Sequence, residues 1–471
     1  MIDVTSAATG NLPRSSEADA SVDGRLTCRY VAQILFCQSS PSTCGRYTDR
    51  LPSPPGVTLR GVWAIGMRVG IIGGSIAGCA TAALLHRAGH DVIVFERSES
   101  GLVSRGAGIT TSTAVWQDMM AHGLIDETLP ACRADYGRFV TRGSGTGQPR
   151  WLGDVHSSSS MRLLNWAHLY QCLRRGVPDE LYRGASTVEL IEAGPHGTTL
   201  HLRPGGSVDF DLVVCADGYR SMGRRLIDPD AAPGYRGMVV WRGLLRESDI
   251  GVDPLGGCDL LRVGYQGGGG ILYYIPGTGQ STEPGKRLLG WGYYLQVRED
   301  TLSSVLVDDQ ERQQSSSVPF GKVHPQVKAG FESRLADLLP PVLFEVMQQT
   351  ANSSIAAIYS VSPRSYVRDR LCLAGDAGAV FPPFTGSGVL KAVANATSLV
   401  NALADASAVD DALRRWSEAQ LEVAAQVMPT AERIERIQVF DMPDLSTMPT
   451  TATNDWMATA HPGAVITLPD V

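Results

Sequence analysis

The chain has 471 residues, which is enough for two or three domains and for a large apolar core. Its formal net charge of −7 at pH 7 argues against a nucleic-acid-binding protein. No apolar run approaches the roughly 20 residues of a membrane-spanning helix, so no membrane association is expected. The nine cysteines are irregularly spaced and form no C-x-x-C pair, so we expect no metal site and a reducing, cytoplasmic compartment.

Residues 1–66 differ in composition from the rest of the chain. They are rich in Ser, Thr, Pro and Gly and show no sustained hydrophobic period, which predicts a disordered extension. The apolar run at 30–37 is too short and too far from the start for a signal peptide. We expect the extension to be irrelevant to function, and the alternative that Met67 is the natural start stays open.

Residues 67–97 carry the clearest motif of the chain. A β-branched run at 69–72 predicts a buried parallel strand, and a small-residue helix closed by Gly89 follows the next turn. A second buried strand at 92–95 ends on Glu96. The turn between the first strand and the helix comprises Gly73, Gly74, Ser75, Ile76, Ala77 and Gly78. This order predicts a dinucleotide-binding unit.

Each position of this unit has a physical reason. Gly73 permits the tight turn, Gly78 lets the helix approach the strand, and the helix N-terminus directs free N–H groups at a pyrophosphate. Glu96 accepts hydrogen bonds from ribose hydroxyls, which favours an adenosine with a free 2′-OH. Ser75 stands where G-x-G-x-x-G has its middle glycine, and serine is small enough for a phosphate to approach. The alternative is a turn that only joins strand to helix.

A basic loop follows the acid. After Arg97 come Arg105 and a glycine-rich turn at 106–109. This loop would either reach back to a bound dinucleotide or lie in solvent as an ordinary surface turn, and the sequence favours neither.

Two later strands also end on an acid–glycine pair. A buried strand at 210–215 runs into an Asp-Gly pair at 217–218, and another at 371–374 runs into a Gly-Asp pair at 375–376. In open α/β sheets, ligands bind at the carboxyl ends of the strands. Either pair alone would be an ordinary turn.

Between about 235 and 300 the pattern changes to alternating strands with Pro-Gly turns, which predicts an antiparallel sheet. Within 287–297 the alternation separates two faces. Leu289, Trp291, Tyr293 and Leu295 fall on one face, and Gly290, Gly292 and Tyr294 fall on the other. An aromatic face suits a flat apolar ligand, although such faces more often belong to the core.

Three segments thus follow predicted buried strands: the turn at 73–78, the Asp-Gly pair at 217–218 and the Gly-Asp pair at 375–376. These three strand ends, taken together, resemble those of the FAD-dependent aromatic hydroxylases, the p-hydroxybenzoate hydroxylase-like class A flavoprotein monooxygenases. The resemblance spans about residues 67–405. The motifs that carry it are GGSIAG, ERSES with RGAGI, VVCADGYRS, GYRGMVVWRGLL, YYIPG with PGKRLLGWGYY, and CLAGDAG with GVLKA.

The resemblance implies an α/β fold, in which a β-sheet substrate domain is inserted into a Rossmann-type FAD-binding domain. The FAD-binding domain is expected in three parts: residues 67–165, with a short excursion to the substrate side, residues 166–234, and residues 363–440 with the C-terminal helices. The substrate-binding middle sheet is expected at 235–362. An extension at 1–66 and a loosely ordered tail at 441–471 complete the expected division.

The resemblance also implies roles in binding FAD. The first turn would hold the pyrophosphate, and Glu96 would hold the adenosine ribose. Arg105 would lie along the diphosphate, and Asp217 would serve both FAD and the passing nicotinamide dinucleotide. Asp376 would bind the ribityl–pyrophosphate side, and the helix that begins near Gly386 would stabilise negative charge on the flavin pyrimidine. The expected cofactor-binding residues are Gly73, Gly74, Ser75, Ile76, Ala77, Gly78, Glu96, Arg97, Arg105, Asp217, Gly218, Gly375, Asp376, Gly386, Ser387, Gly388 and Val389.

The implied reaction is the hydroxylation of a phenolic or N-heteroaromatic small molecule. NADH or NADPH reduces the flavin, dioxygen adds as a C4a-hydroperoxide, and one oxygen passes to the ring. The protein excludes water, positions the ring and helps to ionise its hydroxyl. The residues expected to face the substrate are Pro383, Tyr274, Tyr293 and Trp291, with Tyr273 as a further candidate. The oligomeric state is open, and a homodimer is one option.

The chain departs from the family pattern at Trp166, Ala379 and Leu390, where relatives often carry Arg, His and Asn. These departures leave the substrate open. Alternatives are an epoxidase or Baeyer–Villiger-type enzyme on the same scaffold, and a non-catalytic FAD-binding protein. A flavin halogenase is disfavoured because no W-x-W-x-I-P segment is present, and a plain NAD dehydrogenase leaves the second and third strand ends without a role.

Overall fold

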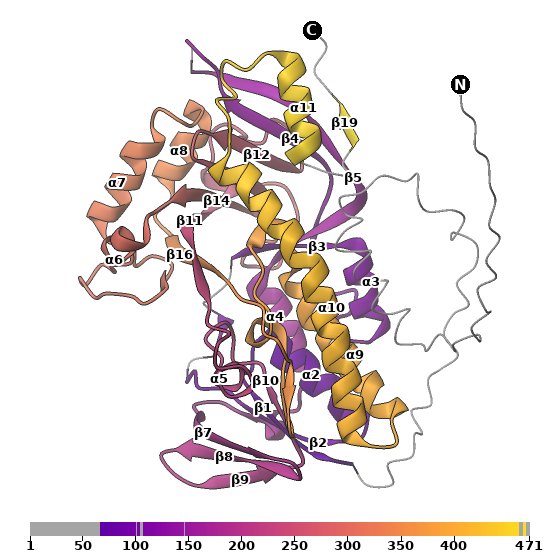
Figure 1. Cartoon of the computed structure of the whole chain (residues 1–471). Coiled ribbons are helices and arrows are strands. Elements are labelled where there is room, and N and C mark those ends of the chain that lie inside the picture. Colours follow the sequence, from indigo (N-terminus) through magenta and orange to yellow (C-terminus); the bar gives the residue numbers. More distant parts are fainter. Residues whose placement is uncertain (1–65, 100, 104–106, 146, 461–464, 468–471) are drawn as a thin grey trace, which may run out of the picture.

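The computed structural model describes residues 66–99, 101–103, 107–145, 147–460 and 465–467 (Figure 1). Residues 1–65 of the expected extension and Arg105 lie outside the described residues. Two sheets dominate the structure, and the chain passes between them several times.

A six-stranded sheet forms the Rossmann-type part. Its strands, in spatial order, are β17 (Val367–Arg368), β18 (Leu371–Leu373), β10 (Leu212–Cys215), β1 (Arg68–Ile72), β2 (Asp91–Phe95) and β6 (Tyr182–Arg183). All neighbours are parallel except β17 and β18. The strands β1, β10 and β18 end at the same edge, because Ile72 pairs with Cys215 and Cys215 pairs with Leu373. The predicted buried strands and their parallel arrangement are therefore confirmed.

Helices cover this sheet. The helix α2 (Ile76–Arg87) packs against α4 (Trp166–Arg175) and α9 (Ser387–Asp405), and α9 packs against the long α10 (Val409–Glu435). In Figure 1, α10 runs from the six-stranded sheet toward the second sheet. A small antiparallel sheet of β7 (Thr187–Gly194), β8 (Gly197–Arg203) and β9 (Ser207–Phe210) lies at the bottom of that view.

The second sheet has ten strands. Along its main path these are β15 (Ser317–Val318), β16 (Ser353–Ser360), β11 (Gly234–Arg246), β14 (Leu288–Gln296), β13 (Gly268–Ile275), β12 (Leu260–Tyr265), β4 (Cys132–Arg142), β5 (Pro149–Asn165) and β19 (Val465–Thr467), and β3 (Gly108–Ser112) also pairs with β5. Only β12 and β4 pair in parallel. One face packs against α7 (Pro325–Leu335) and α8 (Pro341–Gln349) around Trp241 and Met347. The opposite face is free to border a groove.

The remaining elements are short or peripheral. They are α3 (Thr113–Ala121), α5 (Met222–Ile227), α6 (Leu302–Val305), α11 (Thr450–Ala460), the π-helix η8 (Arg436–Phe440), and the 3-10 turns η3 (Asp179–Leu181), η4 (Glu247–Asp249), η5 (Glu299–Thr301), η6 (Gly375–Ala377) and η7 (Pro383–Thr385).

Two parts of the chain differ from the predicted division. The excursion before residue 166 is not short, because β4 and β5 are full members of the large sheet. The segment 441–471, expected to be loosely ordered, contains α11 and β19. The helix is anchored because Met457 is buried and the Trp456 ring meets the Phe139 ring edge-on at 5.2 Å.

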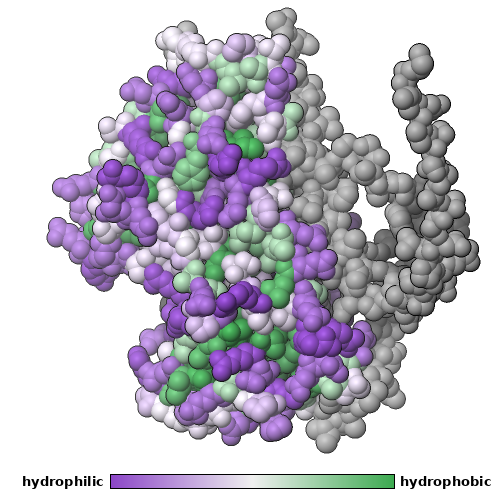
Figure 2. All heavy atoms as spheres, viewed as in Figure 1, coloured by the Kyte–Doolittle hydropathy of each residue, from purple (hydrophilic) through white to green (hydrophobic). Residues whose placement is uncertain are grey.

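Polar residues cover most of the face seen in Figure 2, with apolar areas set among them. No helix in the described ranges is long and apolar enough to span a bilayer. The six cysteines that the structure describes are free thiols, and all but Cys132 are buried.

The first glycine turn sets the distance between α2 and the sheet. A Cβ on Gly78 would lie 1.8 Å from the carbonyl oxygen of Gly73, so no larger residue fits without moving the helix. We expect Gly78→Ala to lower the free energy of unfolding by more than about 2 kcal/mol, as overpacking does elsewhere. Chemical denaturation measures this change.

Gly330→Ala is the matched control, since Gly330 lies in the exposed interior of α7 with nothing within 4 Å of an added Cβ. It should raise the free energy of unfolding by about 0.5–1 kcal/mol through helix propensity. Equal effects of the two substitutions would contradict the packing argument.

Candidate cofactor and substrate site

The first turn is held by its own acid. Gly73 has φ +99° and donates its N–H to the Phe95 carbonyl at 2.8 Å. The Glu96 carboxylate accepts the N–H of Gly74 at 2.9 Å and the N–H of Ser98 at 2.9 Å, and its side chain is buried. Glu96 therefore fixes the turn at the start of α2, whose first N–H groups have no intrahelical acceptor.

The three strand ends meet at this turn. A Cβ on Gly73 would lie 2.4 Å from the Ala216 carbonyl oxygen, and one on Gly375 would lie 2.7 Å from the Ala77 Cβ. These contacts bring together the residues near 73, 217 and 375. Arg97, in contrast, is exposed. It does not line the groove that runs from this turn to the large sheet.

Asp217 acts mainly within the protein. Its Oδ2 accepts the Met222 N–H at 2.7 Å at the start of α5, and burial raises the pKa of its carboxyl. Its Oδ1 is buried and has no hydrogen-bond partner among the described residues. The backbone of Gly218, with φ +82°, lines the groove beside it. Asp217 itself is not among the residues that line this groove, so its predicted contact with a dinucleotide stays a prediction.

Arg224 joins the second and third strand ends, and sequence reasoning assigned no role to it. The buried guanidinium donates to the carbonyl oxygens of Ala231 at 3.1 Å, Asp376 at 3.2 Å and Ala377 at 2.9 Å, and also to that of Tyr219. No pattern in the sequence distinguishes this arginine from its neighbours.

Lys391 is a second residue that sequence reasoning missed. Its buried ammonium donates to Asp376 Oδ1 at 2.6 Å and to the Ala379 carbonyl. The only signal was a lysine in the first turn of a helix, where a cation opposes the helix dipole. Its position at the groove places positive charge where an anionic cofactor would gain from it.

The helix α9 begins at the groove. Gly386 has φ +62° and precedes the helix, and no side chain caps its first turn. Because the first N–H groups of a 19-residue helix lack intrahelical acceptors, this end attracts negative charge. The predicted residues Gly386, Ser387, Gly388 and Val389 all line the groove.

Two adjacent cavities occupy the groove. The larger, of about 530 Å³, runs from the first turn past Asp376 to the free face of the large sheet, and lies within the roughly 300–1,000 Å³ of typical ligand sites. The smaller, of about 190 Å³, lies beyond it, between that sheet and η8. Residues that line both are Thr110, Ile271, Tyr294, Pro383 and Gly386. The predicted substrate-facing Pro383 thus stands at the junction.

Two of the aromatic residues predicted to meet the substrate, Tyr274 and Tyr293, lie on the core side of the sheet. Tyr293 lies in the core against α8, with its hydroxyl 3.5 Å from the Leu343 carbonyl, and Tyr274 donates to Asp253 at 3.1 Å on the same side. Trp291 borders the larger cavity, but its Nε1 donates to Thr350 Oγ1 in that core at 2.9 Å. The alternation was right, and the groove lies on the side of the glycines.

Tyr273 and Tyr294 occupy the groove side instead. The Tyr294 ring packs against Phe384 with centroids 4.6 Å apart. Burial raises the pKa of Tyr294 to about 12, so this phenol stays protonated at neutral pH and is able to donate a hydrogen bond to a ligand. Within the described ranges, no three His, Cys, Asp or Glu side chains gather closely enough to hold a metal ion.

Comparisons with known proteins agree with this geometry. Family models match residues 71–104 (NAD(P)-binding Rossmann-like domain), 235–360 (FAD binding domain-like) and 332–431 (FAD binding domain). The 3-amino-4-hydroxybenzoate 2-monooxygenase of Streptomyces cremeus is 29% identical over 80% of this chain and 89% of its own length. The 2,6-dihydroxypyridine 3-monooxygenase of Paenarthrobacter nicotinovorans is 24% identical over 75% of this chain and 87% of its own length. The solved 2,6-dihydroxypyridine-3-hydroxylase of Arthrobacter nicotinovorans shares the fold, with a TM-score of 0.70, 22% identity, and coverage of 82% and 96% of the two chains.

We expect Asp376→Ala to weaken FAD binding at least tenfold, because it removes the acid of the third strand end and leaves the Lys391 ammonium without its carboxylate. Equilibrium titration of the apoprotein with FAD measures this loss. Asp337→Ala, at an exposed position after α7, is the control and should leave the affinity unchanged. Full flavin affinity in Asp376→Ala would refute the role of this acid.

Proposed function

Because the chain belongs to the FAD-dependent aromatic hydroxylases, the class A flavoprotein monooxygenases, we propose that it hydroxylates a phenolic or N-heteroaromatic small molecule at the junction of its two cavities. FAD is the cofactor, and NADH or NADPH and dioxygen are consumed. The substrates named for two relatives, an aminohydroxybenzoate and a dihydroxypyridine, are both single electron-rich rings. We also propose a cytoplasmic location, which the free thiols support.

One observation carries this proposal. The smaller cavity shares five lining residues with the larger one, at the N-terminal end of α9. A dry cavity of about 150 Å³ is enough to hold benzene, so about 190 Å³ accepts a one-ring compound. A ring in the smaller cavity therefore lies beside whatever fills the junction.

The residues of the groove fit FAD. The N-terminal ends of α2 and α9 direct free N–H groups into it, and Lys391 adds a buried cation. When bound, FAD supplies the electron transfer and oxygen activation of the reaction.

The protein contributes positioning and exclusion of water. Ile271, Phe384 and Pro383 form apolar walls around the junction, which keep solvent away from reactive species. The uncapped end of α9 favours negative charge beside it. Tyr294 offers a phenol that donates a hydrogen bond to a ring hydroxyl or its oxygen anion.

The proposed function is tested with the FAD-loaded protein. Dioxygen uptake is followed with NADH or NADPH in the presence of 3-amino-4-hydroxybenzoate, 2,6-dihydroxypyridine and simple phenols. We expect at least one ring to accelerate NAD(P)H oxidation tenfold or more and to gain one oxygen atom by mass spectrometry. A product with a lactone or epoxide would favour the alternative oxygenases, and no acceleration by any ring would favour a non-catalytic flavoprotein.

Tyr294→Phe and Tyr293→Phe form a matched pair, because the two residues are adjacent on β14 and point to opposite faces. We expect Tyr294→Phe to change kcat/KM for an accepted ring at least fivefold, since it removes a hydroxyl at the junction. Tyr293→Phe should change it less than twofold. The reverse order would mean that the substrate lies on the other face of the sheet.

A further inference from the structure

We infer that the ring substrate carries a carboxylate and that Arg262 binds this carboxylate in the smaller cavity. The inference rests on the proposed function, and it deepens that function by naming the group that the site recognises.

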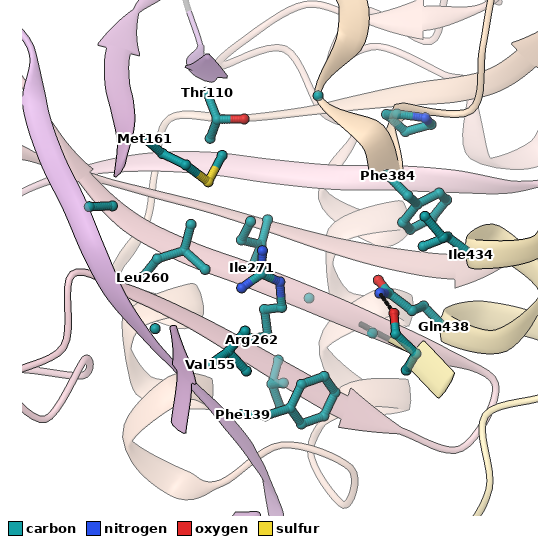
Figure 3. Close-up of a pocket in the computed structure, with 18 of the residues that line it drawn as sticks. Thr110, Phe139, Val155, Met161, Leu260, Arg262, Ile271, Phe384, Ile434 and Gln438 are labelled. Carbon is teal, nitrogen blue, oxygen red and sulfur yellow. Dashed lines mark hydrogen bonds between the residues drawn. The ribbon is translucent and has the colours of Figure 1, made fainter. Parts of the chain in front are cut away.

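Arg262 reaches the cavity from the middle of the large sheet. On β12 it lies opposite Ile271 of β13 on one side and Phe139 of β4 on the other. Ile271 belongs to the wall that both cavities share, so Arg262 stands one strand away from the junction. Figure 3 shows the guanidinium projecting into the cavity beside Ile271.

The guanidinium has no partner within the described part of the protein. No carboxylate lies within 4.0 Å of Arg262, and it donates no hydrogen bond there, whereas Arg236, Arg287 and Arg138 each pair with an acid. The one acid that lines the cavity, Asp135, is paired with Arg133 at 2.6 Å. Burial lowers the pKa of Arg262 to about 10, so the group still carries its charge at neutral pH.

The surroundings of this charge are apolar. Leu260, Met161, Val155 and Phe139 form the cavity wall around it. A cation held among such side chains without an anion is costly, and a bound anion removes that cost. The ligand that complements the site is therefore an apolar ring with one negative group.

A carboxylate fits this description better than a phenolate. Carboxyl groups ionise near pH 4 and phenols near pH 10, so only the former is negative in the neutral range. The guanidinium also binds carboxylate oxygens in pairs. Of the two ring types named for the relatives, an aminohydroxybenzoate offers this group and a dihydroxypyridine does not. The geometry thus favours hydroxybenzoate-type acids.

The test compares two probes that differ in one substituent, the carboxylate of 3-amino-4-hydroxybenzoate and the neutral amide of 3-amino-4-hydroxybenzamide. Their dissociation constants are measured with the FAD-loaded protein by calorimetry, a readout that needs no turnover. We expect the acid to bind at least about 30-fold more tightly than the amide, as charged hydrogen bonds imply. In Arg262→Gln this preference should fall below threefold, and in Arg262→Lys it should be intermediate.

Arg246→Gln is the control, because Arg246 is exposed at the end of β11 and pairs only with Asp249 among described residues. This variant should keep the full preference for the acid over the amide. Equal binding of both probes to the unaltered protein, or a preference that survives Arg262→Gln, would overturn the inference. If Arg262→Gln does not fold, the unaltered protein and Arg262→Lys still decide it. A strong preference without hydroxylation of any ring would refute the proposed function while supporting the carboxylate site.

Discussion

The groove depends on one buried cation that ties distant parts of the chain together. Arg224 follows the second strand end, yet its guanidinium donates to carbonyl oxygens of Asp376 and Ala377 at the third. The charge is satisfied by backbone carbonyls, an arrangement that fixes the main chain and leaves the acid side chains free. Asp376 can consequently pair with Lys391 at the groove instead of being used to hold the loop.

One face of the large sheet packs into the apolar core, and the other face borders the ligand groove. On β14 the residues toward α8 are apolar and include Trp291 and Tyr293, which fill the core, while those toward the groove include Gly290 and Gly292. An added Cβ on either glycine would meet its nearest atom only at ordinary contact distance. The two positions are therefore not tightly packed. The absence of side chains there provides space for a flat ligand.

Local patterns predicted much of this structure, and the failures share a cause. The buried strands and the turn from Gly73 to Gly78 depend on residues near one another in sequence, and each was predicted correctly. The convergence of the three strand ends, which lie far apart in sequence, was expected from the family resemblance and is confirmed. The choice of face on β14, and the positions of Lys391 and Arg262 at the two cavities, depend on what packs opposite, which no local pattern reveals. The strand β5 was underestimated because its serine-rich stretch at 157–160 does not look like a strand.

The two cavities share lining residues, so the affinity for a ligand in one depends on whether the other is filled. A flavin ring in the larger cavity would give the smaller one a side that the protein alone does not supply, so the proposed ring acid would bind holoprotein and apoprotein with different affinities. Thermodynamic reciprocity then requires the ring acid to change flavin affinity by the same factor. If contact with the flavin strengthens the binding of a ring ligand, the same contact strengthens the retention of the flavin by the protein.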